Sequence, residues 1–415
     1  MGRPRTRRGS PEPGWQSVGM SPTPRSDRPF DVVLVGATGF TGGLTAEYLA
    51  AHAPEDLRWA LAGRNQERLE AVRTRLAAID PRLADLALLH VDAGDPASLR
   101  AVAEQARVVV TTVGPYVEHG AGLVAACAEA GTDYADLTGE PEFVDTVYVE
   151  HHARAVETGA RLVHACGFDS IPHDLGALFT VQQLPEGVPI TMRGMLRTNA
   201  TFSGGTFASA LTAFSRAGHM KRALSERRKV EPRPHVDAGR RVRTVARRPH
   251  HDRDSGYWLV PLPTIDPFIV KRSAMALDRY GPDFTYGHYA AVKRLPTAVA
   301  GIGTVGLLAA AAQVPPLRRQ LLKRMPAGTG PSEEQRARSS FAMHFVAEGG
   351  GRTVRTKVSG GDPGYTETAK MLGESAMCLA FDDNPPTAGQ VTTAVAMGDN
   401  LVARLVKAGM GFEVL

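Results

Sequence analysis

Cysteine is scarce in this sequence: Cys127, Cys166 and Cys378 are the only three in 415 residues. Three thiols cannot build a disulfide scaffold, and their spacing matches no cysteine-ligated metal site. The His-Glu-x-x-His, Cys-x-x-Cys and Gly-x-Ser-x-Gly patterns are also missing. Their absence argues against zinc peptidases, dithiol oxidoreductases and serine hydrolases. We therefore expect a protein of a reducing compartment, the cytoplasm, without a metal site.

Lysine is equally scarce, since eight of the 48 basic residues are Lys and forty are Arg. Residues 1–29 hold six Arg against Glu12 and Asp27, which accounts for +4 of the formal net charge of +5. The rest of the chain is nearly neutral, so its charge indicates no nucleic-acid partner. Because residues 1–29 are rich in Pro, Ser, Gly and Arg and lack an apolar run, we expect a disordered basic tail rather than a secretory signal.

Long apolar runs are rare too, and one uncharged stretch of twenty residues stands out at 295–314. Its length just reaches that of a membrane span, but Ala and Gly dominate it. We therefore expect a buried helix pair, or an apolar surface that touches a bilayer or a lipid chain. Lys293 and Arg294 before it, with Arg318 and Arg319 after it, would suit anionic head groups.

The pattern that is present begins with a strand, a glycine turn and a helix. Residues 31–35 form an apolar run, residues 36–42 read Gly-Ala-Thr-Gly-Phe-Thr-Gly, and residues 44–52 have helical character. In a dinucleotide site the first glycine permits the tight turn, the second admits the pyrophosphate and the third lets the helix pack closely. The free N–H groups of the helix start face the phosphates. The turn therefore predicts cofactor contacts from Gly36, Thr38, Gly39, Phe40, Thr41 and Gly42.

Further cofactor contacts are expected where later strands end. Arg64 follows the second strand, where Arg suits a 2′-phosphate, so it favours NADP(H) over NAD(H) unless it only caps the next helix. Asp92 follows the third strand and is expected to contact the adenine amino group, or else to serve as a turn carboxylate. Gly114 and Pro115 follow the fourth strand, beside the expected nicotinamide half.

Short apolar runs alternate with helical segments throughout residues 30–166. Connections this short give a doubly wound parallel sheet, so we expect an α/β domain of Rossmann type that binds NADP. The strands are expected at 31–35, 58–62, 87–91, 108–113, 132–137 and 161–165.

The sixth strand leads into a small polar loop, 166–176, that starts a helix. The loop leaves the carboxyl end of a parallel strand, where ligands bind in open α/β sheets. Asp169, Ser170 and His173 are therefore candidates for the substrate side, with a helix cap as the alternative role of Asp169 or Ser170. Cys166 is a weaker candidate, as a nucleophile.

The remainder of the chain divides into two parts. Residues 167–360 are expected to form an α+β substrate domain, and residues 361–415 to form helices that pack back on the first domain, the last of them at 389–408. The basic segment 221–253 is expected to be a long loop or a solvated helix, with docking of an acidic carrier or a phosphate tail as a functional alternative. Strands of the second domain are expected at 189–196, 256–261, 341–348 and 353–360.

Several short motifs together resemble a known family. They are VGATGFTG at 35–42, AGRN at 62–65, VGPY at 113–116, DYADLTGE at 133–140, GFDSIP at 167–172, GDPGY at 361–365 and AMGD at 396–399. The chain resembles saccharopine dehydrogenase-like oxidoreductases over residues 30–415, and within them the trans-acting enoyl reductases of bacterial lipid biosynthesis.

The resemblance implies an NADPH-linked reductase that serves a polyketide synthase in trans. Such an enzyme reduces an α,β-unsaturated acyl thioester, held on a carrier protein or CoA, on the way to a glycolipid or other lipid. Hydride goes to the β-carbon, charge builds on the thioester oxygen and an acid protonates the α-carbon. Tyr116, beside the expected nicotinamide, and His173 are the expected catalytic residues. Any membrane contact would be peripheral, at the inner face of the plasma membrane. Whether the protein forms a homo-oligomer is left open by the sequence.

Two other functions stay open. A saccharopine-type amino-acid dehydrogenase would need an Arg cluster for its substrate's carboxylates, for which Arg193 and Arg197 are available. A lipid-associated protein without catalysis would bind NADPH and reduce no thioester. The Tyr-x-x-x-Lys pair of Tyr289 and Lys293 lies far outside the nucleotide fold, so a short-chain dehydrogenase is not expected.

Overall fold

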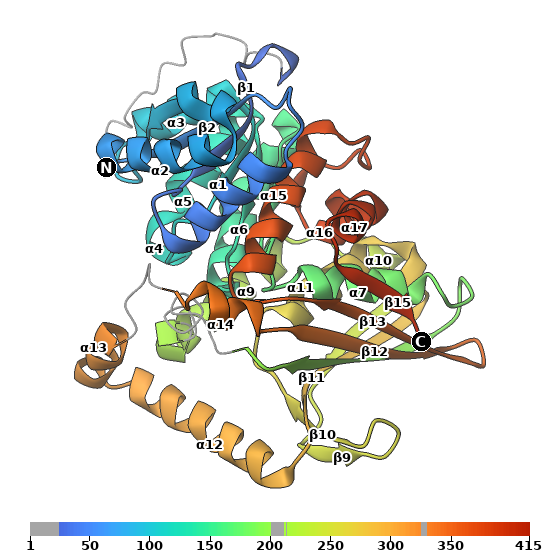
Figure 1. The fold of residues 1–415 in the computed structure, drawn as a ribbon. Coiled ribbons are helices and arrows are strands. Elements are labelled where there is room, and N and C mark those ends of the chain that lie inside the picture. Colours follow the sequence, from blue (N-terminus) through green and yellow to red (C-terminus); the bar gives the residue numbers. More distant parts are fainter. Residues whose placement is uncertain (1–24, 201–210, 213, 325–329) are drawn as a thin grey trace, which may run out of the picture.

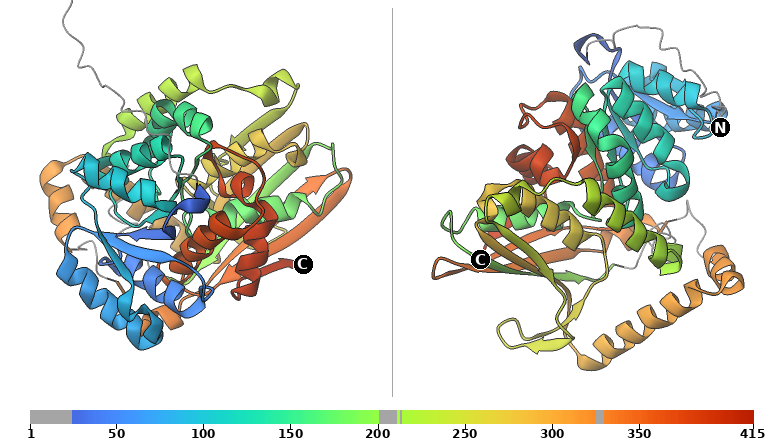
Figure 2. Two further views of the ribbon diagram at one scale, coloured as in Figure 1. Left: turned by 90° about the horizontal axis from the view of Figure 1, so that it is seen from above. Right: turned by 180° about the vertical axis from the view of Figure 1, so that it is seen from behind.

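A computed structural model describes residues 25–200, 211–212, 214–324 and 330–415 of the chain. Two β-sheets, with helices packed on and between them, make up this part of the protein (Figures 1 and 2). Most of the predicted basic tail, residues 1–24, lies outside the described residues.

The first sheet is parallel throughout and has the order β14-β6-β5-β4-β1-β2-β3. The order reverses between β1 and β4, which confirms the doubly wound arrangement expected from the sequence. Its strands are β1 (Phe30–Val35), β2 (Trp59–Gly63), β3 (Ala87–His90), β4 (Ala106–Thr111), β5 (Asp133–Asp136), β6 (Arg161–Val163) and β14 (Gly389–Val391). All six predicted strands are present, and β14 is an addition from the C-terminal part of the chain.

Helices cover both faces of this sheet, because successive side chains of a strand point to opposite faces. Val32 and Leu34 of β1 belong to a core shared with α1, α2 and α15, whereas Val33 and Val35 pack with α3, α5 and α6. The helices are α1 (Phe40–His52), α2 (Gln66–Ile79), α3 (Pro96–Gln105), α4 (Tyr116–His119), α5 (Ala121–Ala130), α6 (Pro141–Thr158) and α15 (Thr366–Phe381).

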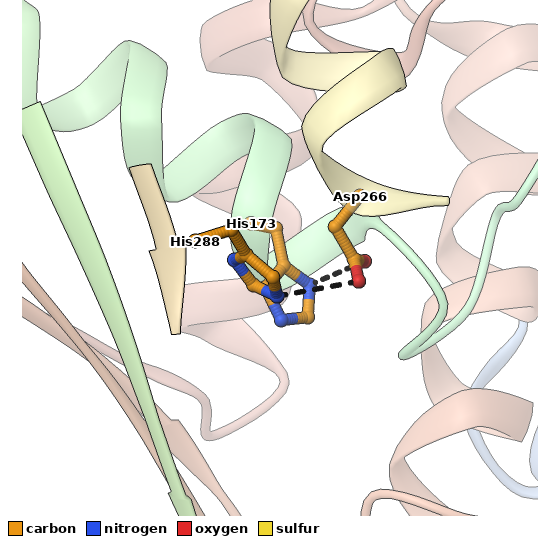
Figure 3. A group of neighbouring side chains, drawn as sticks. All are labelled: His173, Asp266 and His288. Atoms are coloured by element: carbon orange, nitrogen blue, oxygen red, sulfur yellow. Dashed lines mark ion pairs between the residues drawn. The ribbon is translucent and has the colours of Figure 1, made fainter. Parts of the chain in front are cut away.

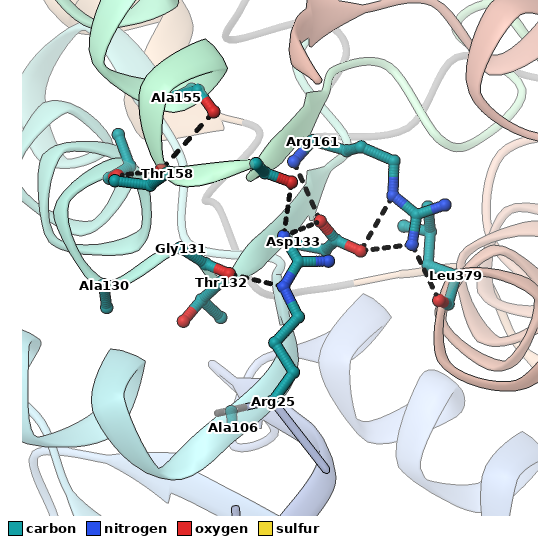
Figure 4. A network of polar contacts seen from close by, with 12 residues as sticks. Arg25, Ala106, Ala130, Gly131, Thr132, Asp133, Ala155, Thr158, Arg161 and Leu379 are labelled. Atoms are coloured by element: carbon teal, nitrogen blue, oxygen red, sulfur yellow. Dashed lines mark hydrogen bonds and ion pairs between the residues drawn. The ribbon is translucent and has the colours of Figure 1, made fainter. Parts of the chain in front are cut away.

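The last residues of the predicted tail are ordered, which corrects that part of the expectation. Arg25–Asp27 form a 3-10 helix, η1, and the side chain of Arg28 is buried. Arg28 Nη1 donates a hydrogen bond to the carbonyl of Ala106 at 2.6 Å. Arg25 pairs with Asp133 at 3.1 Å (Figure 4). Composition predicts a disordered tail here. The guanidinium groups of Arg25 and Arg28 instead fix this segment to the first residues of β5 and β4.

Asp133 also ties the C-terminal part of the chain to the first sheet. Arg161 Nε donates to its carboxylate at 2.9 Å, and Arg161 Nη2 donates to the carbonyl of Leu379 in α15, also at 2.9 Å (Figure 4). The C-terminal residues of α15 are thereby fixed to the amino ends of β5 and β6.

The second sheet is mixed and has the order β15-β13-β12-β7-β11-β10-β9, with β8 paired to β11. Helices α7 (Ile171–Val181) and α11 (Asp266–Ala276) lie between this sheet and the first domain (Figure 1). The strands are β7 (Ile190–Thr198), β8 (Arg241–Val245), β9 (His250–Asp252), β10 (Tyr257–Pro261), β11 (Asp283–Val292), β12 (Phe341–Gly349), β13 (Arg352–Gly360) and β15 (Gly411–Val414). The four strands expected in this part are present, so the second unit is α+β as predicted.

Two expectations for the second half need correction. Segment 221–253 starts as a helix, α9 (Ala217–Val230), which packs on α6, but it continues through α10 (Pro234–Asp237) into strands β8 and β9. Segment 389–408 is not one helix. It holds β14, α16 (Thr393–Ala396) and α17 (Gly398–Lys407), because the positive φ of Gly398 (+48°) breaks a continuous helix.

The uncharged stretch forms α12 (Leu295–Ala312), which projects from the rest of the molecule (Figures 1 and 2). Only 11% of it is buried, so the expected buried helix pair is wrong. Among the described residues it is the one helix long and apolar enough to cross a membrane, by length and composition only. The shorter helices α13 (Pro315–Arg324) and α14 (Glu333–Ala337) follow it.

One buried carboxylate fixes α7, which starts just after β6, to the rest of the second unit. Asp174 accepts hydrogen bonds from Ser273 Oγ of α11 at 2.5 Å, from Thr393 Oγ1 at 2.8 Å and from the Ala394 backbone N–H at 2.9 Å. The carboxyl edge of the first sheet is thereby held against the second unit. Any reaction at that edge takes place at the junction of the two.

Candidate active site

The glycine turn after β1 lies where the strand order reverses. Gly36 has a φ of +94°, and a Cβ there would come within 2.8 Å of Thr112 Oγ1. A Cβ on Gly42 would come within 2.1 Å of the Gly36 carbonyl oxygen, so the helix packs directly on the turn. A Cβ on Gly39 would meet only that oxygen, at 3.4 Å. The space at Gly39 is therefore one that the described residues leave open to a ligand.

The start of α1 suits a phosphate group. No side chain caps this helix at Gly39, which leaves its first backbone N–H groups available to an anion. Thr38 is exposed and Thr41 is half-buried. The ring of Phe40 packs edge-on against Tyr365 with centroids 4.8 Å apart, so Phe40 would offer its backbone rather than its ring. The turn fits the pyrophosphate of a dinucleotide, while the individual contacts stay predictions.

Arg64 directly follows β2 and is exposed. Asn65, not Arg64, caps α2, because the Asn65 side chain accepts from the Arg68 backbone N–H at 2.9 Å. Among the described residues, Arg64 makes no hydrogen bond or ion pair. The alternative role as a cap is therefore not observed, and the guanidinium can meet a 2′-phosphate.

Asp92, after β3, takes the turn role that the sequence left as an alternative. Its Oδ1 accepts from the Gly94 backbone N–H at 2.9 Å, and its own N–H donates to Ser98 Oγ at 3.0 Å. The adenine contact, which the second carboxylate oxygen would make, stays a prediction.

Gly114 and Pro115 lead from β4 into α4 at the edge where the nicotinamide half is expected. The carboxylate of Glu140 caps α4, accepting from the backbone N–H groups of Tyr116 at 3.2 Å and Val117 at 2.9 Å. The end of β4 and the segment after β5 are thus held together by a buried acid that the sequence does not single out.

The phenol of Tyr116 is engaged by the backbone. Its hydroxyl donates to the Thr111 carbonyl at 3.2 Å and accepts from the Leu137 N–H at 3.1 Å. Burial raises the pKa of Tyr116 well above its ordinary value. These contacts favour a positioning role over proton transfer, so a catalytic Tyr116 stays a prediction.

Asp169, in the loop after β6, faces the segment after β5. A Cβ built on Gly139 would lie 3.4 Å from Asp169 Oδ1. Burial raises the pKa of Asp169 to about 7, with smaller contributions from the carboxylates of Asp136 and Glu140. A carboxylic acid that keeps its proton near neutral pH can act as a proton donor. The structure thus brings Asp169 to the edge of the sheet where Tyr116 also lies.

Ser170 and His173 stand at the start of α7, and both are buried. His173 meets Asp266 of α11 and His288 of β11 (Figure 3). The distance from His173 Nδ1 to Asp266 Oδ1 is 3.0 Å, and that from His288 Nε2 to Asp266 Oδ2 is 3.5 Å. Burial lowers the pKa of His173 well below its ordinary value and that of His288 to about 3, and raises the pKa of Asp266 well above its ordinary value.

Sequence reasoning finds His173 but misses Asp266 and His288. They lie on elements far from His173 along the chain, and neither belongs to a recognisable motif. Only the packing of α11 and β11 beside α7 brings the three side chains together.

The residues on which the alternatives rested are occupied elsewhere. Arg193 pairs with Asp252 at 2.8 Å, and the Arg197 guanidinium lies 4.7 Å from the centroid of the Tyr257 ring. Neither forms a carboxylate-binding cluster with the other. Burial raises the pKa of the Cys166 thiol well above its ordinary value, which disfavours a nucleophile.

This architecture matches known proteins. A sequence model described as the saccharopine dehydrogenase NADP binding domain matches residues 32–163, which run from β1 to β6. A saccharopine dehydrogenase (L-Glu forming) from Saccharomyces cerevisiae has the same fold, with a TM-score of 0.53 over 92% of this chain and 99% of that one at 13% identity. The protein is an NADP-dependent oxidoreductase with the saccharopine dehydrogenase fold.

Relatives that match nearly the whole chain identify the family within this class. A trans-acting enoyl reductase of Mycobacterium bovis (strain BCG / Pasteur 1173P2) is 37% identical, over 94% of this chain and 98% of its own. One of Mycobacterium ulcerans (strain Agy99) is 36% identical, over 93% and 97%. A protein of Mycobacterium tuberculosis (strain ATCC 25618 / H37Rv), also named as a trans-acting enoyl reductase though only provisionally, is 40% identical. The match covers 95% of this chain and 99% of that protein. The chain belongs to the trans-acting enoyl reductase family.

Gly39→Val is expected to weaken NADPH binding at least ~100-fold while the protein stays folded, because the side chain fills the space of the pyrophosphate. Calorimetric titration gives the affinity and thermal unfolding the stability. Gly42→Val is the matched comparison, since its Cβ would lie 2.1 Å from a backbone oxygen and should lower the melting temperature. Unchanged NADPH affinity in folded Gly39→Val would contradict the assignment.

Arg64→Ala is expected to weaken NADPH about 10- to 100-fold and to leave NADH binding unchanged, because only NADPH carries the 2′-phosphate. Dissociation constants for both nucleotides check this. Arg68→Ala, on the exposed first turn of α2, is the control and should alter neither affinity. Equal losses for the two nucleotides would refute the 2′-phosphate contact.

Proposed function

We propose that the protein uses NADPH to reduce an α,β-unsaturated acyl thioester, carried by an acyl carrier protein or CoA, during synthesis of a lipid or glycolipid. The names of the full-length relatives support the substrate class. The observation that carries the proposal is the position of Asp169, which faces Gly139 at the edge of the sheet where the nicotinamide half is expected and whose pKa burial raises to about 7.

The strand order supports this placement of Asp169. A dinucleotide bound at the turn after β1 has its adenosine half over β2 and β3 and its nicotinamide half over β4 and the strands beyond it. Asp169 follows β6 and faces Gly139, which follows β5. It therefore lies on the nicotinamide side.

The reduction divides into two transfers. NADPH, when bound at the glycine turn, would supply the hydride for the β-carbon of the thioester. We infer that Asp169 gives its proton to the α-carbon and regains one from solvent. Tyr116 and Glu140 position α4 beside this point through their backbone contacts. His173 stays predicted to act on the substrate side.

The alternatives are weaker on the same contacts. An amino-acid dehydrogenase needs free guanidinium groups for its substrate, and Arg193 and Arg197 are engaged with Asp252 and Tyr257. A protein that binds NADPH without catalysis has no use for a proton donor at the junction.

We also propose that α12 rests on the inner face of the plasma membrane. Its large apolar side chains are strongly exposed, with Val299 at 59% and Leu307 at 74%. Lys293 and Arg294 precede the helix, and Arg318 lies in α13 just after it. Such an arrangement suits a helix lying in the interface of an anionic bilayer. It would keep the enzyme close to substrates with long acyl chains.

The wild-type enzyme should oxidise NADPH only when an enoyl-CoA or an enoyl-carrier protein is present. Because Asp169 is the donor in its protonated form, kcat/KM should be level below about pH 7 and fall about tenfold per unit above it. Asp169→Asn should lower kcat about 10²- to 10⁴-fold and keep NADPH affinity. Glu142→Gln, in the same region but paired with Arg216, should keep the pH profile. NADPH binding without oxidation by either thioester would contradict the enoyl reductase activity.

Vesicles of phosphatidylcholine with phosphatidylglycerol should sediment the wild-type protein. The double variant Ile302→Glu, Leu307→Glu should bind at least ~10-fold more weakly, because each exposed side chain is expected to contribute about 1 kcal/mol on burial in the interface. Val149→Glu, Val156→Glu, on the exposed face of α6, adds the same charge and should leave binding unchanged. A wild-type protein that stays in the supernatant would end this proposal.

A further inference from the structure

Three buried side chains from three separate elements converge near the start of α7 (Figure 3). His173, Asp266 and His288 each offer one ligand atom, and these atoms lie within 4.8 Å of one another. None of the three residues is more than 4% exposed. The proton transfer assigned to Asp169 uses neither Asp266 nor His288.

Four polar atoms of this cluster lack hydrogen-bond partners within the described part of the chain. They are His173 Nδ1 and Nε2, His288 Nε2 and Asp266 Oδ1. A buried polar atom without a partner costs about 1–3 kcal/mol, so several in one place need a cause. His173 Nδ1 and Asp266 Oδ1 are 3.0 Å apart yet do not form an aligned hydrogen bond. Both atoms are therefore left without a hydrogen bond in a buried site.

The two separations that involve Asp266 are close to those between ligands of one metal ion. Ligand bonds of about 2.0–2.1 Å in a tetrahedral zinc site put neighbouring ligand atoms about 3.3 Å apart. The two contacts of Asp266 are 3.0 Å and 3.5 Å. Metal-bound imidazoles usually have their second nitrogen held by a further partner. Here His288 Nδ1 lies 3.1 Å from the hydroxyl of Tyr286.

We propose that His173, Asp266 and His288 bind a divalent transition-metal ion of the Zn²⁺ type. Two imidazoles and one carboxylate are a common ligand set for zinc with an open position. Three protein ligands leave a fourth tetrahedral position for water or a substrate oxygen. The proposal does not depend on the enoyl reductase activity, because it rests on the ligand atoms alone.

The test uses the untagged full-length protein, stripped with a chelator and titrated with Zn²⁺ and Co²⁺ against a competing chromophoric chelator. We expect one equivalent of either ion, the visible absorption of four-coordinate Co²⁺ and a higher melting temperature with Zn²⁺. His288→Gln and Asp266→Asn should each weaken binding more than ~100-fold, and Tyr286→Phe about 10-fold. His344→Gln, at a half-buried histidine on β12, is the control and should bind as the wild type does.

Dissociation constants of the wild type weaker than about 10 µM for both ions would overturn the proposal. So would an ion that remains bound in both His288→Gln and Asp266→Asn. If either variant fails to fold, the Co²⁺ spectrum of the wild type and the Tyr286→Phe affinity decide the question. A six-coordinate Co²⁺ spectrum would refute the tetrahedral site.

Discussion

The buried carboxylate of Asp136 sets the geometry on which the site depends. Its Oδ1 accepts from the backbone N–H groups of Thr138 and Ala165, and its Oδ2 contacts Tyr134 Oη and His164 Nδ1. A fully buried charge cannot give up such partners without a large penalty, so the segments leaving β5 and β6 have one arrangement. Glu140 and the loop that carries Asp169 continue from those two segments.

The C-terminal part of the chain contributes to both sheets. α15 covers the first sheet, β14 extends it, and β15 adds the last strand to the second. Because the returning segment touches both units, they cannot separate without losing the contacts of Asp174 with Thr393 and Ala394. Burial beside this junction raises the pKa of Asp169 to about 7.

The sequence predicts those parts of the molecule whose structure depends on residues that are close together along the chain. The glycine turn and the six strands of the first domain depend on short runs of residues, and they are where the sequence placed them. β14 is three residues long and shows no pattern of its own, because its partner β6 lies far away along the chain. Asn65 rather than Arg64 caps α2, a distinction of one residue that composition cannot make. Asp266 and His288 join His173 only through packing.

The junction gathers acids at a place where reduction of a thioester creates negative charge. The carboxylates of Asp136 and Glu140 accept hydrogen bonds from backbone N–H groups, which offset much of their negative charge. For Asp169, burial and the carboxylates of Asp136 and Glu140 outweigh a backbone hydrogen bond and raise the pKa to about 7, so part of it keeps its proton near neutral pH. Once that proton has moved to carbon, the new carboxylate faces its acidic neighbours, and burial favours rapid return of a proton from solvent. The same burial that makes Asp169 a weak acid thus resets it for the next turnover.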